Sequence, residues 1–258
     1  MHELIGRIIL FFVSFLPVWV LLKLESIFAR STGKGQKENL SSEVALCLGL
    51  LQGEPNIFLD VGANKGEYTL EVLKHYPDLK SYLFEPSPEN IEVLERSFPE
   101  NDVNVFGIAL SNFNGVSNLF SDFPGSGTAS LTKREIPSSD VTFDLLTKVE
   151  VSTVEEFWNK NINYDYIDLL KIDVEGHELD VLEGCGEKIK SIKVIQFEFG
   201  GTHIDTRVFF RDFWNFFESN DFCLYRIADK KCIEIKSYSL DLEVFQTTNY
   251  IAMNRTPT

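Results

Sequence analysis

The segment FLDVGANKG, residues 58–66, joins an apolar stretch to a turn that contains Gly62 and Gly66. Because glycine has no Cβ atom, Gly62 would let the backbone pass close to a ligand. If a helix follows at once, its first backbone amides would be free to bind a carboxylate. Asp60 places a negative charge where an ammonium or sulfonium group could sit, and Asn64 adds a polar side chain. This segment therefore predicts a ligand-binding turn.

Glu85 lies at the end of the next apolar stretch and is followed by Pro86. In folds built from alternating strands and helices, an acidic residue at this place can accept hydrogen bonds from two ribose hydroxyls. The proline restricts Glu85 to extended backbone geometry. Together with the Gly62 turn, this carboxylate predicts a nucleoside ligand.

Three cofactor classes could use such a turn, and the glycine spacing separates them. A nucleoside triphosphate would require G-x-x-x-x-G-K-[ST], which is not present at this turn. A dinucleotide would require G-x-G-x-x-G, whereas the spacing here is Gly62-x-x-x-Gly66. S-adenosylmethionine carries no phosphate and needs one close backbone approach and a carboxylate for its ribose. We therefore predict S-adenosylmethionine; a nicotinamide-dependent oxidoreductase and a non-catalytic scaffold that retains the fold are the alternatives.

A second group of ionisable residues occupies LLKIDVEGHE, residues 169–178. The carboxyl ends of strands in an open α/β sheet face the ligand crevice, and a buried strand rarely contains Lys171 and Asp173 without a reason. Histidine exchanges protons near neutral pH, so His177 and Asp173 are the candidate general bases. Lys171 would orient Asp173 or the substrate through its charge. One glutamate in this segment is explained by the start of a helix, where negative charge is favourable.

The crevice should also receive residues that follow the next apolar segment. Glu198 ends that segment, and the loop GGTHIDTR, residues 200–207, adds His203 and Arg207. These polar groups suit a polyhydroxylated substrate, although an ordinary loop that caps the next helix would explain them equally well. No metal-site spacing is present, so we predict no metal. Residues 124–127, PGSG, have the composition of a closing lid.

These residues need a scaffold that brings several strand ends together. Strands are predicted over 56–61, 81–84, 103–108, 166–172, 192–199, 222–227 and 244–253. Helices are predicted over 65–75, 153–158, 175–190 and 207–219. One further helix should begin at residue 87, and another should run from a cap at Ser41 or Ser42 to about residue 52. Residues 111–150, rich in Asn, Gly, Ser and Pro, predict a hairpin-like insertion. The alternation predicts a Rossmann-like α/β fold with a mostly parallel, doubly wound sheet. The last two strands predict an antiparallel edge.

The DVGANKG turn, Phe84-Glu85-Pro86, Ala109-Leu110-Ser111 and LLKIDVEGHE together resemble the FkbM methyltransferase family, over roughly residues 56–227. The resemblance implies a class I methyltransferase fold and O-methylation of a hydroxyl, often on a sugar or polyketide. It also places Ala109 among the cofactor-binding residues. Residues 152–156, STVEE, resemble the T-L-D-D stretch of the family, with Val and Glu in place of Leu and Asp. We therefore expect an O-methyltransferase acting on a saccharide, glycan or related small molecule.

The N-terminus is apolar, and residues 8–22 read IILFFVSFLPVWVLL. We expect an apolar helix over 1–30, a linker over 31–40 and one methyltransferase domain over 41–258. At about 1.5 Å per residue, the apolar run alone is shorter than a hydrocarbon core of about 30 Å. Two interpretations remain open, membrane association through residues 4–24 and a soluble helix buried against the domain. If the segment inserts, the basic residues after the run would leave the domain on the cytoplasmic side, and we expect a cytoplasmic protein that is either free or tethered to that face of the membrane.

Composition limits the class of partner. The 258 residues suit one large α/β domain, and the net charge of −15, without a basic stripe, argues against nucleic acid. A neutral or cationic small molecule remains compatible with this charge. The four cysteines, Cys47, Cys185, Cys223 and Cys232, show no C-x-x-C or zinc spacing, which favours reduced thiols.

Overall fold

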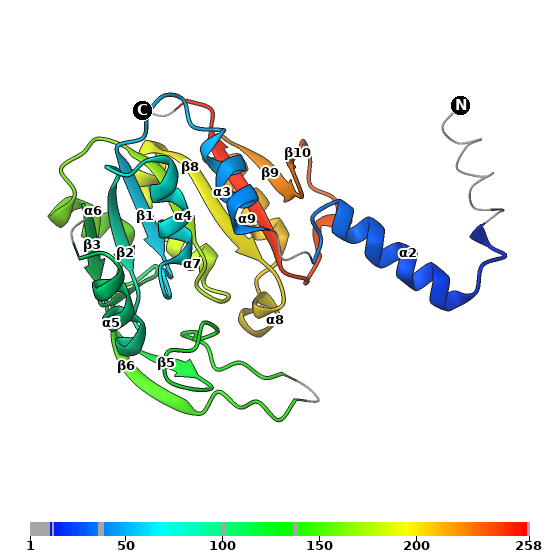
Figure 1. Cartoon of the computed structure of the whole chain (residues 1–258), viewed down its shortest axis with the longest axis horizontal. Coiled ribbons are helices and arrows are strands. Elements are labelled where there is room, and N and C mark those ends of the chain that lie inside the picture. Colours follow the sequence, from blue (N-terminus) through cyan, green and yellow to red (C-terminus); the bar gives the residue numbers. More distant parts are fainter. Residues whose placement is uncertain (1–10, 12, 36–38, 100–101, 137–138, 257–258) are drawn as a thin grey trace.

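The computed structural model describes residues 11, 13–35, 39–99, 102–136 and 139–256. A single eight-stranded sheet, in the order β10-β9-β11-β8-β7-β1-β2-β3, forms the centre of the domain (Figure 1). Its parallel part consists of β1 (Ile57–Val61), β2 (Lys80–Phe84), β3 (Val103–Phe106), β7 (Ile167–Ile172) and β8 (Ile192–Phe199). This arrangement confirms the predicted Rossmann-like α/β fold.

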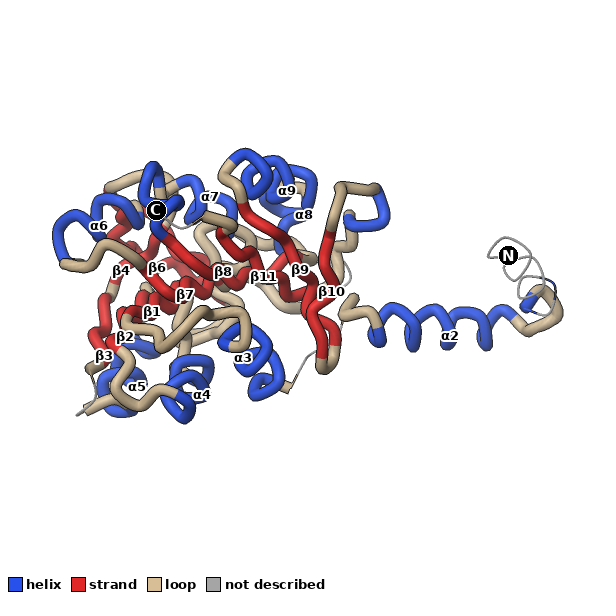
Figure 2. The backbone as a smooth tube through the Cα atoms, turned by 90° about the horizontal axis from the view of Figure 1, so that it is seen from above, coloured by secondary structure: helices blue, strands red, loops and turns tan. Residues whose placement is uncertain are grey.

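Helices cover both faces of the sheet, as Figure 2 shows. One face carries α3 (Leu40–Leu48), α4 (Glu67–His75) and α5 (Pro88–Ser97), and the other carries α6 (Val154–Asn161), α7 (Glu178–Glu183) and α9 (Phe210–Ser219). Every residue of β1 and β7 is therefore buried, which explains why these strands are mostly apolar, with Asp60, Asp168 and Lys171 as their charged residues. Aromatic rings fill much of the core; Phe197 stacks on Phe213 at a centroid distance of 4.9 Å.

The C-terminal strands differ from the prediction in their order. β11 (Thr248–Asn254) lies antiparallel between β8 and β9 (Phe222–Ala228), inside the sheet. The antiparallel edge is instead β10 (Lys231–Ile235), which the sequence prediction missed. The difference in burial agrees with this strand order, because Ile251 of the internal strand β11 is fully buried whereas Lys231 of the edge strand β10 is exposed.

The predicted hairpin-like insertion is confirmed. The predicted strand 103–108 is divided, so that β3 stays in the main sheet and β4 (Ile108–Leu110) joins a smaller one. In that smaller sheet, β5 (Gly115–Ser121) pairs antiparallel with β6 (Leu145–Ser152), and β4 pairs with β6. The insertion thereby forms a separate wall beside the ends of β1 and β2.

Local backbone geometry corrects three predicted helix boundaries. The side chain of Asn39, and not a serine, caps α3 by accepting a hydrogen bond from the Ser41 amide at 3.1 Å. The helix predicted from residue 175 begins only at Glu178, because Glu175 has a φ of 56°. It also ends earlier, and a 3₁₀ segment covers 186–191. The helix predicted over 207–219 begins only at Phe210, as α9. Arg207, with a φ of 59°, ends a short helix that was not predicted, α8 (Thr202–Thr206).

The apolar N-terminal run is not one helix in the described residues. Pro17, with a ψ of 145°, precedes α2 (Val18–Ser31), and residues 1–10 and 12 lie outside the described part of the chain. α2 extends away from the domain and buries none of its residues, so it does not pack against the domain as one interpretation expected. Among the described residues, no helix combines the length and the apolar character needed to cross a membrane.

Candidate active site

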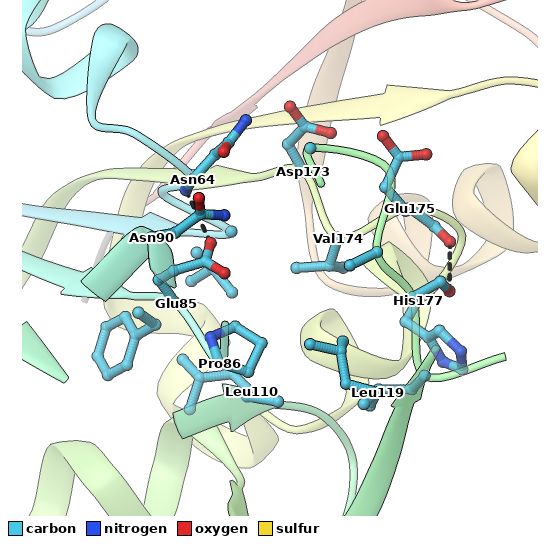
Figure 3. Close-up of a pocket in the computed structure, with 18 of the residues that line it drawn as sticks. Asn64, Glu85, Pro86, Asn90, Leu110, Leu119, Asp173, Val174, Glu175 and His177 are labelled. Carbon is cyan, nitrogen blue, oxygen red and sulfur yellow. Dashed lines mark hydrogen bonds between the residues drawn. The ribbon is translucent and has the colours of Figure 1, made fainter. Parts of the chain in front are cut away.

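A cavity that is open to solvent, with about 580 Å³ of empty space, lies where β1 and β2 end, and the insertion closes one side of it (Figure 3). Its wall includes six of the residues predicted from the sequence, namely Gly62, Asn64, Glu85, Ala109, Asp173 and His177. Segments far apart in the chain supply these residues, because the parallel strands all end at the same edge of the sheet. We call this space the first cavity.

Gly62 is the residue around which the turn is built. Its φ is 76°, and a Cβ atom there would lie 1.9 Å from the carbonyl oxygen of Asp173, so only glycine fits. The amides of Gly62 and Ala63 both donate to the carbonyl oxygen of Phe84, at 2.9 and 3.1 Å. These two turn amides are therefore used within the protein. The prediction that free amides at the start of the following helix bind a carboxylate concerns α4, which begins at Glu67, and it stays a prediction.

Glu85 is held by two backbone amides at the end of β2. Its Oε2 accepts a hydrogen bond from the Asn64 amide at 2.8 Å, and its Oε1 accepts one from the Ser87 amide at 2.9 Å. Burial raises the pKa of Glu85, and the two amides oppose this effect. Each carboxylate oxygen can accept a second hydrogen bond, so the group can still bind the hydroxyls of a ribose.

Two amide oxygens in the first cavity lack a partner among the described residues. Asn64 Oδ1 and Asn90 Oδ1 are buried and accept no hydrogen bond. A buried polar atom without a partner is costly, and the amino and hydroxyl groups of a nucleoside would satisfy both. The first cavity therefore fits the nucleoside part of S-adenosylmethionine. The sequence prediction missed Asn90, although a helix starting at Pro88 places it in the first turn beside Glu85.

A second cavity, of about 720 Å³ and open to solvent, adjoins the first. Gly62, Asn64 and Asp173 line both cavities, and Lys171 and Glu198 line only the second. Six further polar residues of its wall were not predicted as site residues, namely Glu43, Lys65, Glu67, Tyr68, Gln196 and Asn249. The second cavity thus joins predicted residues of β7 and β8 to residues of α3, α4 and β11.

Lys171 and Asp60 form an ion pair beneath the turn. They are direct neighbours in the register of β1 and β7, and Lys171 Nζ lies 3.2 Å from Asp60 Oδ1. Lys171 also donates to the carbonyl oxygen of Gly62 at 2.8 Å and lies 3.7 Å from Asp173 Oδ2. Burial by itself would lower the pKa of Lys171, but the carboxylates of Asp60 and Asp173 outweigh it and raise the pKa. Lys171 therefore holds the turn as a cation, and Asp60 lines neither cavity.

His177 lines the first cavity with both ring nitrogens in hydrogen bonds. Nδ1 lies 2.6 Å from Asp180 Oδ2, and Nε2 lies 2.9 Å from the hydroxyl of Thr132. Ser130 Oγ also donates to the carbonyl oxygen of Glu175 at 2.8 Å. These contacts attach the insertion to the loop after β7.

The predicted lid contributes to the same wall. Ser126 and Gly127, from the segment 124–127, line the first cavity, while a closing motion of this segment stays a prediction. Arg134 of the insertion lies 3.2 Å from Glu175 Oε2. Burial and the Asp173 carboxylate raise the pKa of Glu175 to about 8, although Arg134 opposes them.

Besides Asp60, three predicted residues lie outside both cavity walls. Gly66 caps α4 with a φ of 82°, and a Cβ there would lie 2.7 Å from the Phe98 ring, so it serves packing. His203 is 1% exposed, and its Nε2 lies 2.9 Å from Glu178 Oε2. Arg207 ends α8 in a left-handed conformation. The substrate-binding roles of His203 and Arg207 remain predictions, and neither residue lines a cavity.

Glu198 should make the stability of the protein depend on pH. Burial raises its pKa to about 9, and the neighbouring carboxylates of Asp173 and Glu178 add to the effect. The folded state therefore keeps a proton that the unfolded chain loses near its ordinary pKa of 4.5. The contribution of protonated Glu198 to the unfolding free energy is complete below that pH and is lost as the pH rises to about 9. Between pH 6 and 9, wild type should lose about 1–3 kcal/mol more unfolding free energy than Glu198→Gln, measured in urea. Parallel pH profiles for the two proteins would contradict this assignment.

The chain matches the family model of the methyltransferase FkbM domain over residues 60–227, more than half of its length. It is 32% identical over 156 residues to methyltransferase sdnD of Sordaria araneosa, covering 50% of this chain and 60% of that one. It is also 26% identical over 160 residues to the 2-O-methyltransferase NoeI of Sinorhizobium fredii, covering 58% and 65%. The chain thus spans less than two thirds of either relative.

A solved structure from Clostridium thermocellum, described as an rRNA methylase, shares the fold. Its TM-score is 0.50 at 7% sequence identity, over 86% of this chain and 99% of that one. The family match includes the Gly62 turn, Glu85 and Asp173, and it favours the methyl donor over the nicotinamide alternative. The chain belongs to the FkbM family of S-adenosylmethionine-dependent methyltransferases.

Proposed function

We propose that the protein is an O-methyltransferase that acts on a hydroxyl of a saccharide, glycan or related small molecule. The observation that carries the proposal is the position of Asp173, whose carboxylate lines both cavities where they meet. A base at this junction can reach a hydroxyl in one cavity that faces a methyl donor in the other. A 2-O-methyltransferase among the relatives supports a hydroxyl as the acceptor.

Some residues of the site would bind the methyl donor, and a different residue would accept the proton. When bound, S-adenosylmethionine supplies an electrophilic methyl group on its sulfonium. Glu85 and Asn90 would hold the nucleoside in the first cavity, and Lys171 fixes the Gly62 turn through its carbonyl oxygen. A neutral hydroxyl must lose its proton as it attacks, so a base within hydrogen-bond reach is needed.

Asp173 suits this role better than His177. Both ring nitrogens of His177 are hydrogen-bonded to side chains, and the residue lines only the first cavity. Asp173 is partly exposed, and its nearest cation, Lys171, keeps a distance of 3.7 Å. We therefore propose that Asp173 accepts the proton of the acceptor hydroxyl and that His177 attaches the insertion to the loop after β7.

S-adenosylhomocysteine should raise the melting temperature of the protein, because a ligand that binds only the folded state stabilises it. At about 100 times its dissociation constant, the ligand adds about 2.7 kcal/mol, which corresponds to roughly 5–10 °C. Incubation with labelled S-adenosylmethionine and cell-envelope glycans should then place label on a glycan oxygen. An unchanged melting temperature, or label on nitrogen or carbon, would overturn the proposal.

Asp173→Asn should lower kcat by about 10²–10⁴-fold, the usual contribution of a general base. His177→Gln should cost less than about tenfold, because it loses contacts to Thr132 and Asp180 and no proton acceptor. S-adenosylhomocysteine affinity, measured by calorimetry, should stay close to wild type in Asp173→Asn. A larger loss of kcat in His177→Gln than in Asp173→Asn would exchange the two assignments.

A further inference from the structure

The apolar segment at the N-terminal end takes no part in either cavity. Phe15, Val18, Trp19 and Leu22 keep between 59% and 72% of their surface exposed, and α2 buries none of its residues. The helix extends away from the domain in both views, so the domain does not cover these side chains (Figures 1 and 2). A contiguous exposed apolar surface of this kind marks an interaction site.

The apolar residues surround α2 and do not form a single stripe. Residues 18–22, VWVLL, are consecutive and exceed one helical turn of about 3.6 residues, so apolar side chains point to every side. One partner helix, such as that of a second copy of this chain, would contact a single stripe and leave the remaining side chains in water. Lipid tails contact a helix from all sides. The pattern therefore favours a membrane as the partner over a second copy.

Charge is distributed unevenly along this segment. Residues 11–22 contain no charged residue, and Lys23, Arg30 and Lys34 follow on the side of the domain. Lys23 Nζ lies 5.5 Å from the centre of the Trp19 ring. Tryptophan and basic residues together are typical of the boundary between lipid tails and headgroups. This order places the apolar residues farther from the domain than the cations.

The three cations are available for an external anion. None of them forms an ion pair with a carboxylate of the described residues, and Lys34 instead donates to the carbonyl oxygen of Asp241 at 3.1 Å. Arg30 and Lys34 line an open groove, with about 1060 Å³ of empty space, between α2 and residues 246–247, and Glu25 is the one carboxylate in its described wall. Guanidinium and ammonium groups bind phosphate oxygens strongly. Because the whole chain carries a net charge of −15, this local excess of cations is complementary to anionic lipid headgroups.

The segment joins the domain at the edge of the sheet that carries the active site. The Gly35 amide donates to the carbonyl oxygen of Thr247 at 3.1 Å, and the next residue, Thr248, pairs with Phe199 at the end of β8. A Cβ atom on Gly33 would lie 1.9 Å from the carbonyl oxygen of Ile227, so the chain after α2 packs closely on β9. A membrane that holds α2 would therefore keep this edge of the domain close to its surface.

We propose that α2 and the apolar residues directly before it insert into one leaflet of an anionic membrane, with Lys23, Arg30 and Lys34 among the lipid phosphates. α2 has 14 residues and a length of about 21 Å, which is shorter than a hydrocarbon core of about 30 Å, so this helix enters the membrane without crossing it. The inference goes beyond the proposed function, because it names a surface and its partner and does not depend on the methyl acceptor.

Flotation of the full chain with lipid vesicles tests the proposal. The protein should bind vesicles of phosphatidylcholine with about 30% phosphatidylglycerol at least about tenfold more tightly than vesicles of phosphatidylcholine alone, because each net cation at the surface adds to the attraction. Trp19 emission should shift to shorter wavelength as the ring leaves water, and Trp19→Phe should bind as wild type does without this shift. No binding to the anionic vesicles, or equal binding to both compositions, would overturn the proposal.

Variants connect the binding to the two parts of the segment. Phe15→Glu with Trp19→Glu should lower the affinity for anionic vesicles at least about tenfold, because carboxylates replace apolar groups that enter the lipid. Arg30→Gln with Lys34→Gln should reduce the preference for anionic lipid about tenfold. Phe113→Glu, at an exposed phenylalanine in the loop after β4, is the matched control and should bind vesicles as wild type does.

These variants separate the membrane proposal from folding and from the methyltransferase function. Because none of the substituted side chains is buried, all variants should keep the melting temperature and the S-adenosylhomocysteine affinity of wild type. If wild type binds S-adenosylhomocysteine but no vesicles, only the membrane proposal fails. If it binds vesicles but no S-adenosylhomocysteine, only the methyltransferase function fails. A dimer that Phe15→Glu with Trp19→Glu dissociates, in a protein that does not bind vesicles, would make a second copy the partner of α2.

Discussion

Lys171→Met is expected to lower the free energy of unfolding by about 3–5 kcal/mol, because it leaves a buried carboxylate without its cation. Asp60 is fully buried, and without Lys171 it keeps a hydrogen bond from the Thr69 hydroxyl at 2.7 Å. Methionine has a similar length, so the loss of packing is small. Urea unfolding measures the change, and the melting temperature should fall by roughly 10 °C.

A matched control separates this effect from the loss of any lysine that is paired with a buried carboxylate. Lys193→Met removes the partner of Asp168 at 2.6 Å, but Asp168 keeps hydrogen bonds from the amides of Asn56 and Ile57. That variant should lose only about 1 kcal/mol. Adding Asp60→Asn to Lys171→Met should restore much of the stability, since no unpaired charge then remains. A double variant no more stable than Lys171→Met would contradict the explanation.

Glu85→Gln is expected to weaken the binding of S-adenosylhomocysteine about 100-fold. A glutamine offers one acceptor oxygen where Glu85 uses two, so either the Asn64 amide or the Ser87 amide loses its partner. The neutral amide also forms weaker hydrogen bonds to ribose hydroxyls than a carboxylate does, by about 1.5–3 kcal/mol in total. Isothermal titration calorimetry measures the affinity directly.

Glu89→Gln provides the control for this experiment, because Glu89 is exposed in the first turn of the same helix and lies outside the first cavity wall. It should bind the ligand as wild type does. Urea unfolding of Glu85→Gln without ligand shows whether the turn itself is disturbed. An affinity within about threefold of wild type, in a folded Glu85→Gln variant, would remove Glu85 from the cofactor site.

The predicted elements are most accurate where the signal is local. β1, β2, β7 and β8 agree with the prediction within about one residue, because each is an apolar run that ends at a turn residue or a polar group. β10 was missed because its five residues, KCIEI, are short and mostly accessible to solvent, and they become a strand only by pairing with β9. The division of 103–108 into β3 and β4 likewise depends on two different partner strands.

The candidate site likewise combines residues that a local sequence signal predicts with residues that only long-range packing brings together. Gly62, Glu85 and Asp173 were predictable because each follows its own strand, and parallel strands carry such residues to one edge of the sheet. Glu43 and Asn249 are 206 residues apart and carry no local motif. They meet because α3 packs beside α4 while β11 enters the sheet next to β8.

The sequence by itself determined the fold class, the methyl donor and the position of the Gly62 turn, since glycine spacing and strand-end carboxylates are short-range chemistry. The tertiary structure decided which polar groups remain available. It uses the Gly62 and Ala63 amides for the Phe84 carbonyl, commits Lys171 to Asp60, and gives both nitrogens of His177 a partner. Hydrogen bonding and ion pairing depend on distances across the fold, and residue order alone does not specify them.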